Sequence, residues 1–292
     1  MMGRAHRQKD IKRSKGGGYL IKTKSIIFPK EYDHIYLIPI GDFHVGDPSG
    51  LGGSTEEGRY ATKKFRSMVQ YIKDKPYAYT FLMGDLFDAV TKTSLGNVYQ
   101  QQYTLGTAKD FLTEELRPIK DKILGCIEGN HEERIIKAVG DSPVKDLSKF
   151  LNIEYFPNWC AYLYLSVGES RKGEYDKRRP CIYTVYMHHL IGGGATIGGK
   201  FNRVKKLQLM VLADIYCGAH VHLKGVTKEK YIIPDIRGKN LTGMQQAYCL
   251  TGSFMGYADY SVKGMYEKPA TGAVRIRLNG EPEKGKDIHA SI

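Results

Sequence analysis

The sequence predicts an α/β protein in which two mixed β-sheets pack as a sandwich flanked by helices. Three observations lead to this fold class. Apolar runs typical of buried strands alternate with amphipathic, helix-like segments in the first half of the chain. Strand-like runs dominate the second half and supply the second sheet. Polar clusters follow several of these runs, at the carboxyl ends of strands where ligands gather in such sheets.

The first half of the chain is expected to form three strand–helix pairs. We expect strands at residues 34–40, 77–83 and 122–127, and helices at residues 55–74, 106–116 and 132–138. The first helix carries apolar residues near a 3.6-residue period and follows Ser54 and Thr55, either of which can cap it. Pro118 stops the second helix. This order predicts a parallel sheet with right-handed crossovers.

The second half is richer in strands. We expect them at residues 161–167, 181–187, 215–218, 223–226, 231–234, 245–251 and 272–278. A charged loop, residues 169–180, separates the first two, and a helix is expected at residues 203–212. No repeat or linker divides the chain, so we expect one domain at residues 25–292 after a basic arm at residues 1–24. The motifs lie in a core at about residues 34–225, and further strands follow at residues 226–280.

Positive charge is in excess and is concentrated at the front of the chain. The 292 residues include 44 Lys and Arg against 31 Asp and Glu, a formal net charge of +13. In residues 1–24 the basic residues stand against Asp10 alone, and a run of glycines interrupts them. We expect a flexible arm that orders on a polyanionic partner, or a solvated tail with no role. Nucleic acid, DNA in the first place, is the expected partner.

Export and membrane insertion are not expected. No apolar core follows the basic N-terminal residues, and no run approaches the roughly 20 apolar residues that cross a bilayer. The five cysteines form no C-x-x-C pair, and four fall in or beside strand-like runs, so we expect buried free thiols. These observations favour a reduced, cytoplasmic protein and leave its oligomeric state open.

Five polar clusters lie where apolar runs stop. In chain order they are Gly41-Asp42-Phe43-His44, Gly84-Asp85-Leu86-Phe87-Asp88, Gly129-Asn130-His131-Glu132, His188-His189 and His220-Val221-His222. Asp42 and His44 stand two apart on a segment that we expect to be extended, so their side chains point the same way. Asp85 offers two oxygens that can bridge two ions, and Asn130 adds a neutral oxygen. Any one cluster is commonly a turn, a cap or a packed histidine, but five in this order favour a binuclear metal site.

The donor types narrow the choice of metal. Oxygen and nitrogen ligands together suit transition metals better than Ca²⁺, and the lack of thiolates disfavours a structural zinc. We expect two divalent ions, Mn²⁺ in the first place, with Fe, Zn²⁺, Ni²⁺ or Co²⁺ as alternatives. Two such ions about 3.5–4 Å apart clamp a phosphoryl group and lower the pKa of a bridging water.

The order D-x-H, G-D-x-x-D, G-N-H-E, H and H-x-H resembles the calcineurin-like metallophosphoesterase superfamily, over residues 38–222. The resemblance implies a β-sandwich with helices outside and a dinuclear site in which Asp85 bridges the metals. It implies that the first metal is bound by Asp42, His44 and His222, and the second by Asn130, His188 and His220. It further implies that a hydroxide held between the metals attacks phosphorus. His131 then protonates the leaving oxygen, worth about 10²–10⁴ in rate, and Asp88 orients His131.

Two positions leave the pattern open. Ala219 stands before His220, where the superfamily usually has glycine, which is a small change. His189 directly follows His188, so either can be the ligand, and we prefer His188 because it comes first after the strand.

Neither a protein Ser/Thr phosphatase nor a P-loop nucleotide site is expected. Protein Ser/Thr phosphatases of this superfamily carry arginines where this chain has Ala89-Val90 and Glu128. Residues 194–200 nearly match a phosphate-binding P-loop, but Phe201 replaces the required Ser or Thr, so we expect a Gly-rich loop beside the histidines. Basic residues at its end either hold a phosphate backbone or form an ordinary solvated helix face; they are Lys200, Arg203, Lys205 and Lys206.

The expected function is a metal-dependent phosphodiesterase that acts on nucleic acid, as a DNA nuclease or a DNA-end-processing enzyme. The alternative is a phosphatase or phosphodiesterase for small nucleotides or phosphorylated metabolites. A third hypothesis is an inactive nucleic-acid-binding accessory protein, against which the complete donor set and His131 weigh.

Overall fold

The computed structural model describes most of the chain. The described residues are 20–88, 90, 98–168, 172–173, 176–177, 180–194, 196–236, 238–257, 268, 270–281 and 284–292. Most of the basic arm and most of the charged loop 169–180 therefore lie outside the described residues, although that loop includes the short pair β6 (Lys172–Gly173) and β7 (Asp176–Lys177). Among the described helices, none combines the length and the apolar character needed to cross a membrane.

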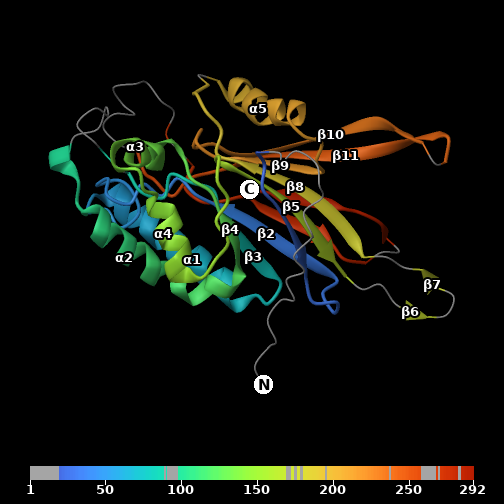
Figure 1. The fold of residues 1–292 in the computed structure, drawn as a ribbon, viewed down its shortest axis with the longest axis horizontal. Coiled ribbons are helices and arrows are strands. Elements are labelled where there is room, and N and C mark those ends of the chain that lie inside the picture. Colours follow the sequence, from blue (N-terminus) through green and yellow to red (C-terminus); the bar gives the residue numbers. More distant parts are fainter. Residues whose placement is uncertain are drawn as a thin grey trace.

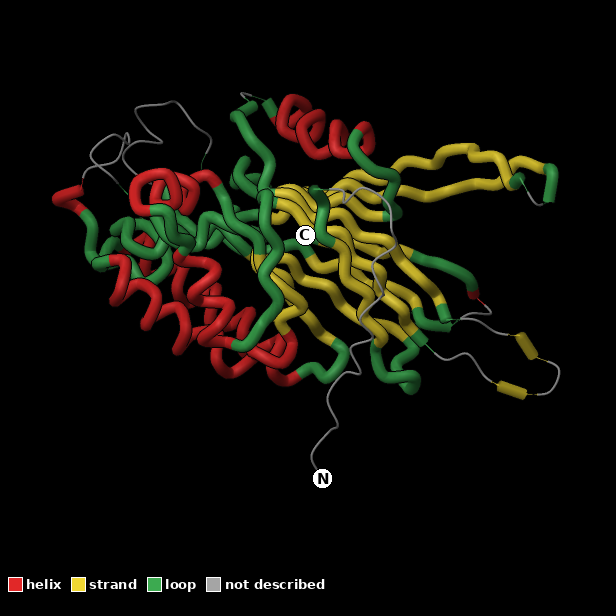
Figure 2. The backbone as a smooth tube through the Cα atoms, in the orientation of Figure 1, coloured by secondary structure: helices red, strands yellow, loops and turns green. Residues whose placement is uncertain are grey.

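Two β-sheets pack face to face, and helices cover the outer face of each (Figures 1 and 2). The five-stranded sheet has the order β13 (Ile288–Ser291), β12 (Arg275–Asn279), β2 (His34–Ile40), β3 (Ala78–Leu82) and β4 (Ile123–Cys126). The six-stranded sheet has the order β1 (Thr23–Ile27), β5 (Cys160–Val167), β8 (Cys181–His188), β9 (Ile215–Gly218), β11 (Asn240–Thr251) and β10 (Lys224–Asp235). Both sheets are mixed: β2, β3 and β4 are parallel to one another, and β12 runs antiparallel to β2. The predicted fold class is confirmed.

The helices form two outer layers (Figure 1). On the five-stranded sheet lie α1 (Glu56–Asp74), α2 (Leu105–Leu116), the 3₁₀ turn η2 (Arg117–Lys122) and α4 (Pro143–Leu151), while η1 (Val98–Gln100) precedes α2. On the six-stranded sheet lie α5 (Ile197–Lys205) and the 3₁₀ turn η3 (Lys206–Leu209). Helix α3 (Asn130–Val139) begins where β4 has ended. The parallel strands and their crossover helices thus leave one edge of the sandwich, at the strands' carboxyl ends, open for a site.

Helix α1 shows why the local sequence folds as predicted. The Thr55 side chain accepts the N–H of Gly58 at 3.1 Å, which caps the first turn. Phe65 and Ile72 are fully buried against the sheet on one stripe of the helix. Burying a side chain of this size contributes roughly 1.5–3 kcal/mol, so the amphipathic stripe fixes which face of α1 packs.

Strand β8 sets the orientation of the residues that follow it. Tyr183, Val185 and Met187 are fully buried between the two sheets. Tyr186 belongs instead to the core under α5. This alternation is the ordinary period of two along a strand, and it decides on which side each of the next two histidines lies.

Three predictions of local structure differ from the structure. The arm was expected to reach residue 24, but Thr23 and Lys24 belong to β1, which pairs with β5, and the neighbouring Lys22 forms an ion pair with Glu154. The helix expected at residues 203–212 begins earlier, at Ile197, and gives way to η3. The short strands expected at residues 223–226 and 231–234 are one strand, β10, which pairs with β11 over their full length and projects beyond the sandwich (Figure 2).

Candidate metal centre

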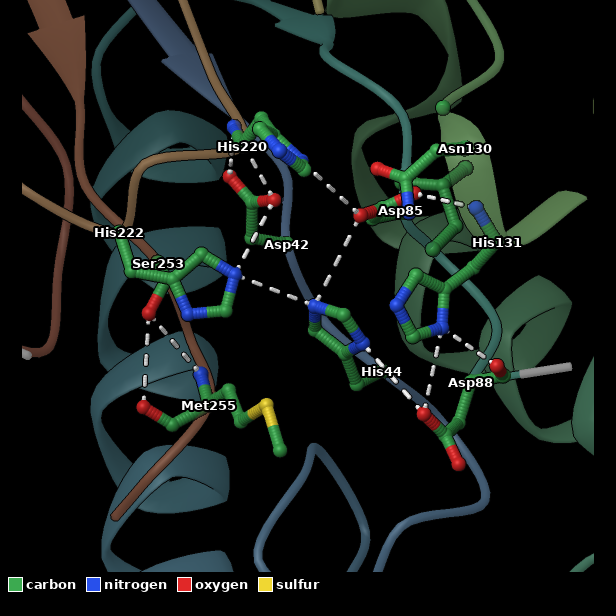
Figure 3. A network of polar contacts seen from close by, with 12 residues as sticks. Asp42, His44, Asp85, Asp88, Asn130, His131, His220, His222, Ser253 and Met255 are labelled. Atoms are coloured by element: carbon green, nitrogen blue, oxygen red, sulfur yellow. Dashed lines mark hydrogen bonds and ion pairs between the residues drawn. The ribbon is translucent and has the colours of Figure 1, made fainter. Parts of the chain in front are cut away.

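The polar clusters converge at the carboxyl ends of the strands, and Figure 3 shows members of the first, second, third and fifth of them close together. The first three follow β2, β3 and β4, and the last two follow β8 and β9. Because β2–β3–β4 are parallel neighbours in one sheet and β8–β9 in the other, each set of strand ends meets at a common edge. The sandwich therefore brings together donors that are up to 180 positions apart, as the 178-residue separation of His44 and His222 illustrates.

The backbone of this edge is strained at the donors. Positive φ angles occur at Asp42 (50°), His44 (47°), Asp85 (48°), His220 (73°) and His222 (49°). Such a conformation costs a non-glycine residue about 1–3 kcal/mol and persists only where the surroundings enforce it. The expectation that the segment from Asp42 to His44 is extended is therefore wrong, since both residues have a left-handed backbone conformation. Strain of this kind concentrated at one edge is typical of a functional site.

Asp42, His44 and His222 form the first donor group. The Nε2 atoms of the two histidines are 3.2 Å apart, and Nε2 of His222 is 3.4 Å from Oδ1 of Asp42. Ligands bonded to one ion at about 2.0–2.2 Å are separated by distances of this size. The three atoms therefore suit a single divalent ion.

Asp85, His189 and His220 form the second donor group. Nε2 of His189 lies 3.1 Å from Oδ2 of Asp85 and 3.3 Å from Oδ1 of Asn130. Nδ1 of His189 donates to the carbonyl oxygen of Met83 at 2.8 Å. This bond fixes the tautomer and directs Nε2 into the group, as is usual for a metal-binding imidazole.

Asp85 belongs to the second group and also lies near His44 of the first, with which it forms a further, overlapping group that includes His131. Its Oδ2 lies 4.0 Å from Nε2 of His44 and 4.0 Å from Nδ1 of His220. Its Oδ1 accepts the backbone N–H of His131 at 2.9 Å. A single oxygen of Asp85 thus faces both groups, whereas the sequence predicts that its two oxygens bridge the two ions.

The electrostatics of the buried donors suit cations. Burial would raise the pKa of Asp42 and of Asp85, but neighbouring histidines, His222 for the first and His189 for the second, outweigh it and hold both pKa values below the ordinary range. Burial and the nearby His131 lower the pKa of His44. Its buried Nδ1 has no hydrogen-bond partner among the described residues and lies 3.6 Å from Oδ1 of Asp88. Ionised carboxylates, neutral imidazole and an amide oxygen are the donors that Mn²⁺, Fe and Zn²⁺ accept. The residues therefore fit two divalent ions.

His188 lies outside both groups, and the preference for it as a ligand is corrected to His189. His188 continues the face of β8 that carries Tyr186, and its Nδ1 accepts the N–H of Leu190 at 2.8 Å. Burial, followed by the neighbouring His189, lowers the pKa of His188 to about 4, which keeps it neutral. His189 continues the inward face of β8, and the alternation of Tyr183, Val185 and Met187 is the sequence signal that would have identified it.

His131 and Asp88 lie together beside the first group (Figure 3). Nδ1 of His131 donates to the carbonyl oxygen of Asp88 at 2.5 Å and is 3.3 Å from its carboxylate Oδ1. The other carboxylate oxygen of Asp88 accepts an N–H of the Gln101 side chain. No sequence motif pointed to Gln101. Burial would lower the pKa of His131, but Asp85 and Asp88 outweigh it and raise this pKa to about 9. His131 is therefore oriented by Asp88, and in the metal-free protein the raised pKa favours its protonated form.

Glu132 has a structural role at the site that the sequence analysis missed. Its buried carboxylate accepts four backbone N–H groups, at distances of 2.7–3.0 Å. Three belong to the loop after β3 and one to Gly129, the N-cap of α3; the donors are Asp85, Leu86, Phe87 and Gly129. Glu132 lies three residues after the cap, the position from which the Glu of a capping box reaches back to the cap N–H, although Gly129 has no side chain to complete the box.

The predicted substrate-binding cations lie on α5 and η3, over the outer face of the six-stranded sheet. Arg203 donates to the carbonyl oxygen of Gly193 at 3.0 Å, and Lys205 pairs with Glu229 at 2.6 Å. Arg203, Lys205 and Lys206 line a shallow hollow of about 440 Å³, and Lys200 lies in the preceding turn of α5. Their contact with a phosphate backbone stays a prediction.

Comparisons with known proteins find likeness in structure but none in sequence. No protein-family model matches the chain, and no curated protein matches it. A predicted phosphoesterase from Streptococcus pneumoniae is 12% identical at a TM-score of 0.33, covering 88% of this chain and 98% of that one. A candidate 5′-nucleotidase from Staphylococcus aureus is 11% identical at a TM-score of 0.40, covering 88% and 52%. The calcineurin-like phosphoesterase YfkN from Bacillus subtilis is 11% identical at a TM-score of 0.35, covering 88% and 90%.

At TM-scores this low, the assignment rests on the strands and donors of the chain itself. Two mixed sheets with helices outside, and two donor groups sharing Asp85 at the strand ends, are what the resemblance to calcineurin-like metallophosphoesterases implies. The structure therefore has the fold and the donor arrangement that the resemblance implies.

Proposed function

We propose that this phosphoesterase is a phosphodiester hydrolase of nucleic acid, acting as a nuclease or in the processing of DNA ends. The observation that carries the phosphoester chemistry is the shared Oδ2 of Asp85, which makes one dinuclear centre of the two donor groups. The net charge of +13 supports a polyanionic substrate, because a polymer of phosphates is bound largely by Lys and Arg.

The residues of the site divide the work of hydrolysis. Two divalent ions held by the donor groups would lower the pKa of a bound water and neutralise charge on the phosphoryl oxygens. Asp42, His44 and His222 would hold one ion, and Asn130, His189 and His220 the other, with Asp85 between them.

His131 supplies the proton for the leaving group. Its Nδ1 is fixed on the carbonyl oxygen of Asp88, so Nε2 is the atom that can face the substrate. In the metal-free protein, Asp85 and Asp88 outweigh burial and raise the pKa of this ring to about 9, which favours its protonated form. Transfer of that proton to the departing oxygen is typically worth about 10²–10⁴ in rate.

The first experiment compares a polymer with a small diester. The chain is incubated with Mn²⁺ and either end-labelled DNA, single- and double-stranded, or bis-p-nitrophenyl phosphate. Asp85→Asn removes the shared oxygen's charge, and Asp110→Asn, at an exposed position on α2, is the matched control. Cleavage of DNA by the wild type and Asp110→Asn, but not by Asp85→Asn, is the expected result.

The other outcomes decide between the hypotheses. Hydrolysis of the small diester without cleavage of DNA would exclude the nuclease and leave a hydrolase of nucleotides or phosphorylated metabolites. Undiminished hydrolysis of both substrates by Asp85→Asn would contradict the dinuclear site itself. Binding of DNA and of metal with no hydrolysis would favour the accessory protein.

The basic arm is tested separately. Removal of residues 1–19 leaves β1 complete and takes away six Lys and Arg residues, namely Arg4, Arg7, Lys9, Lys12, Arg13 and Lys15. If the arm binds the polymer, the truncated chain binds DNA more weakly and with a smaller dependence on salt. Hydrolysis of the small diester stays at the wild-type rate.

A further inference from the structure

We infer that Arg134 is a substrate-positioning residue, whose guanidinium binds a non-bridging oxygen of the reacting phosphoryl group beside His131. Arg134 lies in the first turns of α3, three positions after His131. The inference rests on the proposed phosphoester chemistry but not on the choice between polymer and small substrate.

The guanidinium lies directly against the imidazole. Nη2 of Arg134 is 3.3 Å from Nε2 of His131, and Nη1 is 3.4 Å from Nδ1. Since Nδ1 donates to the carbonyl oxygen of Asp88, it has no lone pair to offer the guanidinium. At 3.3 Å, Nη2 of Arg134 lies beside Nε2, the nitrogen of His131 that Asp88 does not engage and that can face a leaving oxygen.

Among the described residues, Arg134 lacks the anion that a half-buried guanidinium ordinarily has. It has five N–H donors in a fixed plane and stays charged at all relevant pH values. No carboxylate forms an ion pair with it in the described part of the chain, whereas Lys137, one turn later on α3, pairs with Glu133. The cation is held next to an imidazole at the mouth of the metal centre.

A phosphoryl group would supply the missing partner. The oxygens of one phosphoryl group lie within about 2.5 Å of one another, so when Nε2 of His131 reaches one of them, a neighbouring oxygen can come within hydrogen-bond distance of Arg134. A planar guanidinium also matches two phosphate oxygens at once, which a lysine ammonium cannot do. Arg134 and His131 then act on the same group from the same helix, the first by holding it and the second by protonating the leaving oxygen.

The test uses the full-length, Mn²⁺-loaded protein and two readouts. The variants are Arg134→Gln and Arg134→Lys, with Lys137→Gln as a matched control that removes an exposed cation from the same helix. For bis-p-nitrophenyl phosphate, kcat/KM is expected to fall by about 10²-fold in Arg134→Gln and by about tenfold in Arg134→Lys. The control is expected to keep the wild-type value.

The second readout is binding, which a merely structural role would not change. Calorimetry with inorganic phosphate is expected to show at least about tenfold weaker binding in Arg134→Gln, with metal content and melting temperature unchanged. Unchanged phosphate affinity in Arg134→Gln would overturn the inference. If Arg134→Gln fails to fold, Arg134→Lys is the deciding variant. A kcat/KM and a phosphate affinity that both equal those of the wild type in Arg134→Lys would overturn the inference.

Failure of the inference differs from failure of the proposed function. A wild type that hydrolyses no phosphoester, yet binds phosphate through Arg134, contradicts the function and supports the inference. If the wild type hydrolyses the diester and Arg134→Gln does so equally fast, the function is supported and the inference is contradicted. If the wild type neither hydrolyses the diester nor binds phosphate, both are wrong.

Discussion

The carboxylate of Glu132 accepts the backbone N–H of Asp85 at 3.0 Å, so a residue of the third cluster fixes the main chain of the second. The same carboxylate accepts the N–H groups of Leu86 and Phe87. The loop that presents the shared ligand is therefore tied to the start of α3, where Asn130 and His131 lie.

Replacement of Glu132 by Gln is expected to weaken metal binding by about 10–100-fold, the usual effect of losing a residue that holds a metal ligand in place. A neutral amide keeps only one acceptor oxygen for four N–H donors. Titration with Mn²⁺, followed by calorimetry, measures the change. Glu133→Gln, the adjacent position on the outer side of α3, is the control and should bind as the wild type does. Equal affinity in Glu132→Gln and the wild type would show that the loop is held by other contacts.

His189 and His188 can be separated by metal content. In His189→Asn the content of Mn²⁺ is expected to fall from about two ions per chain to about one, because the second donor group loses an imidazole nitrogen. His188→Asn is expected to retain both ions, since its ring lies on the other face of β8. Elemental analysis of the two purified variants measures this. The reverse result would restore His188 as the ligand.

Gly129 has no room for a side chain. A Cβ atom there would lie 2.2 Å from Oδ1 of Asp85 and 2.6 Å from Nε2 of His189. Gly129→Ala is therefore expected to lower the affinity for Mn²⁺ by at least about tenfold, through displaced ligands. Gly106→Ala is the control, because a Cβ on Gly106 meets only Oγ1 of Thr104, at 3.8 Å, and alanine favours the helix by up to about 1 kcal/mol. Unaltered metal binding in both variants would mean that the ligands can shift without loss.

The pH dependence of folding has two sources: His131, whose pKa is raised to about 9, and His189. Burial would lower the pKa of His189, but Asp85 outweighs burial and raises this pKa in the metal-free protein from 6.5 to about 9. A raised pKa stabilises the folded chain fully below about pH 6.5, and that stabilisation is lost as the pH rises through about 9. Mn²⁺ competes with the proton on His189, so its affinity should increase over the same interval.

Two measurements check this dependence. Thermal unfolding with a chelator should show a melting temperature that falls between about pH 6.5 and 9.5, and Mn²⁺ titrations should show an affinity that rises. His289→Gln changes an exposed histidine on β13 and should reproduce both profiles. A metal affinity that is constant across this interval would contradict the assignment.

Much of the fold was predictable because its signals are local. The strand His34–Ile40 was predicted with its observed bounds, since an apolar run stops abruptly at Gly41. Helix α1 was predicted to within a residue, because Thr55 and the apolar stripe both act within a few turns. The same holds for the order of the polar clusters, each of which follows a strand.

The differences arise where distant contacts decide. The left-handed backbone at Asp42 and His44 depends on contacts with the loop after β3, where the carbonyl oxygen of Asp85 accepts the N–H groups of Phe43 and His44 at 2.8 and 3.1 Å. Helix α5 begins before its expected start because the Thr196 side chain caps it, although two glycines in its first turn disfavour a helix. The first contact joins residues more than 40 positions apart and is invisible in a local pattern, whereas the cap by Thr196 is a local signal that the two glycines obscure.

Each donor group takes its members from both layers of the sandwich. Asp42 and His44 follow a strand of the five-stranded sheet, whereas His222 follows a strand of the six-stranded sheet. In the other group, Asp85 comes from the first sheet and His189 from the second. An ion bound in either group would thus connect the two sheets through its ligands. Neither half of the chain has a complete set of ligands by itself. Metal uptake consequently reports the completed assembly of the sandwich, and it adds its binding free energy to the cohesion of the two sheets.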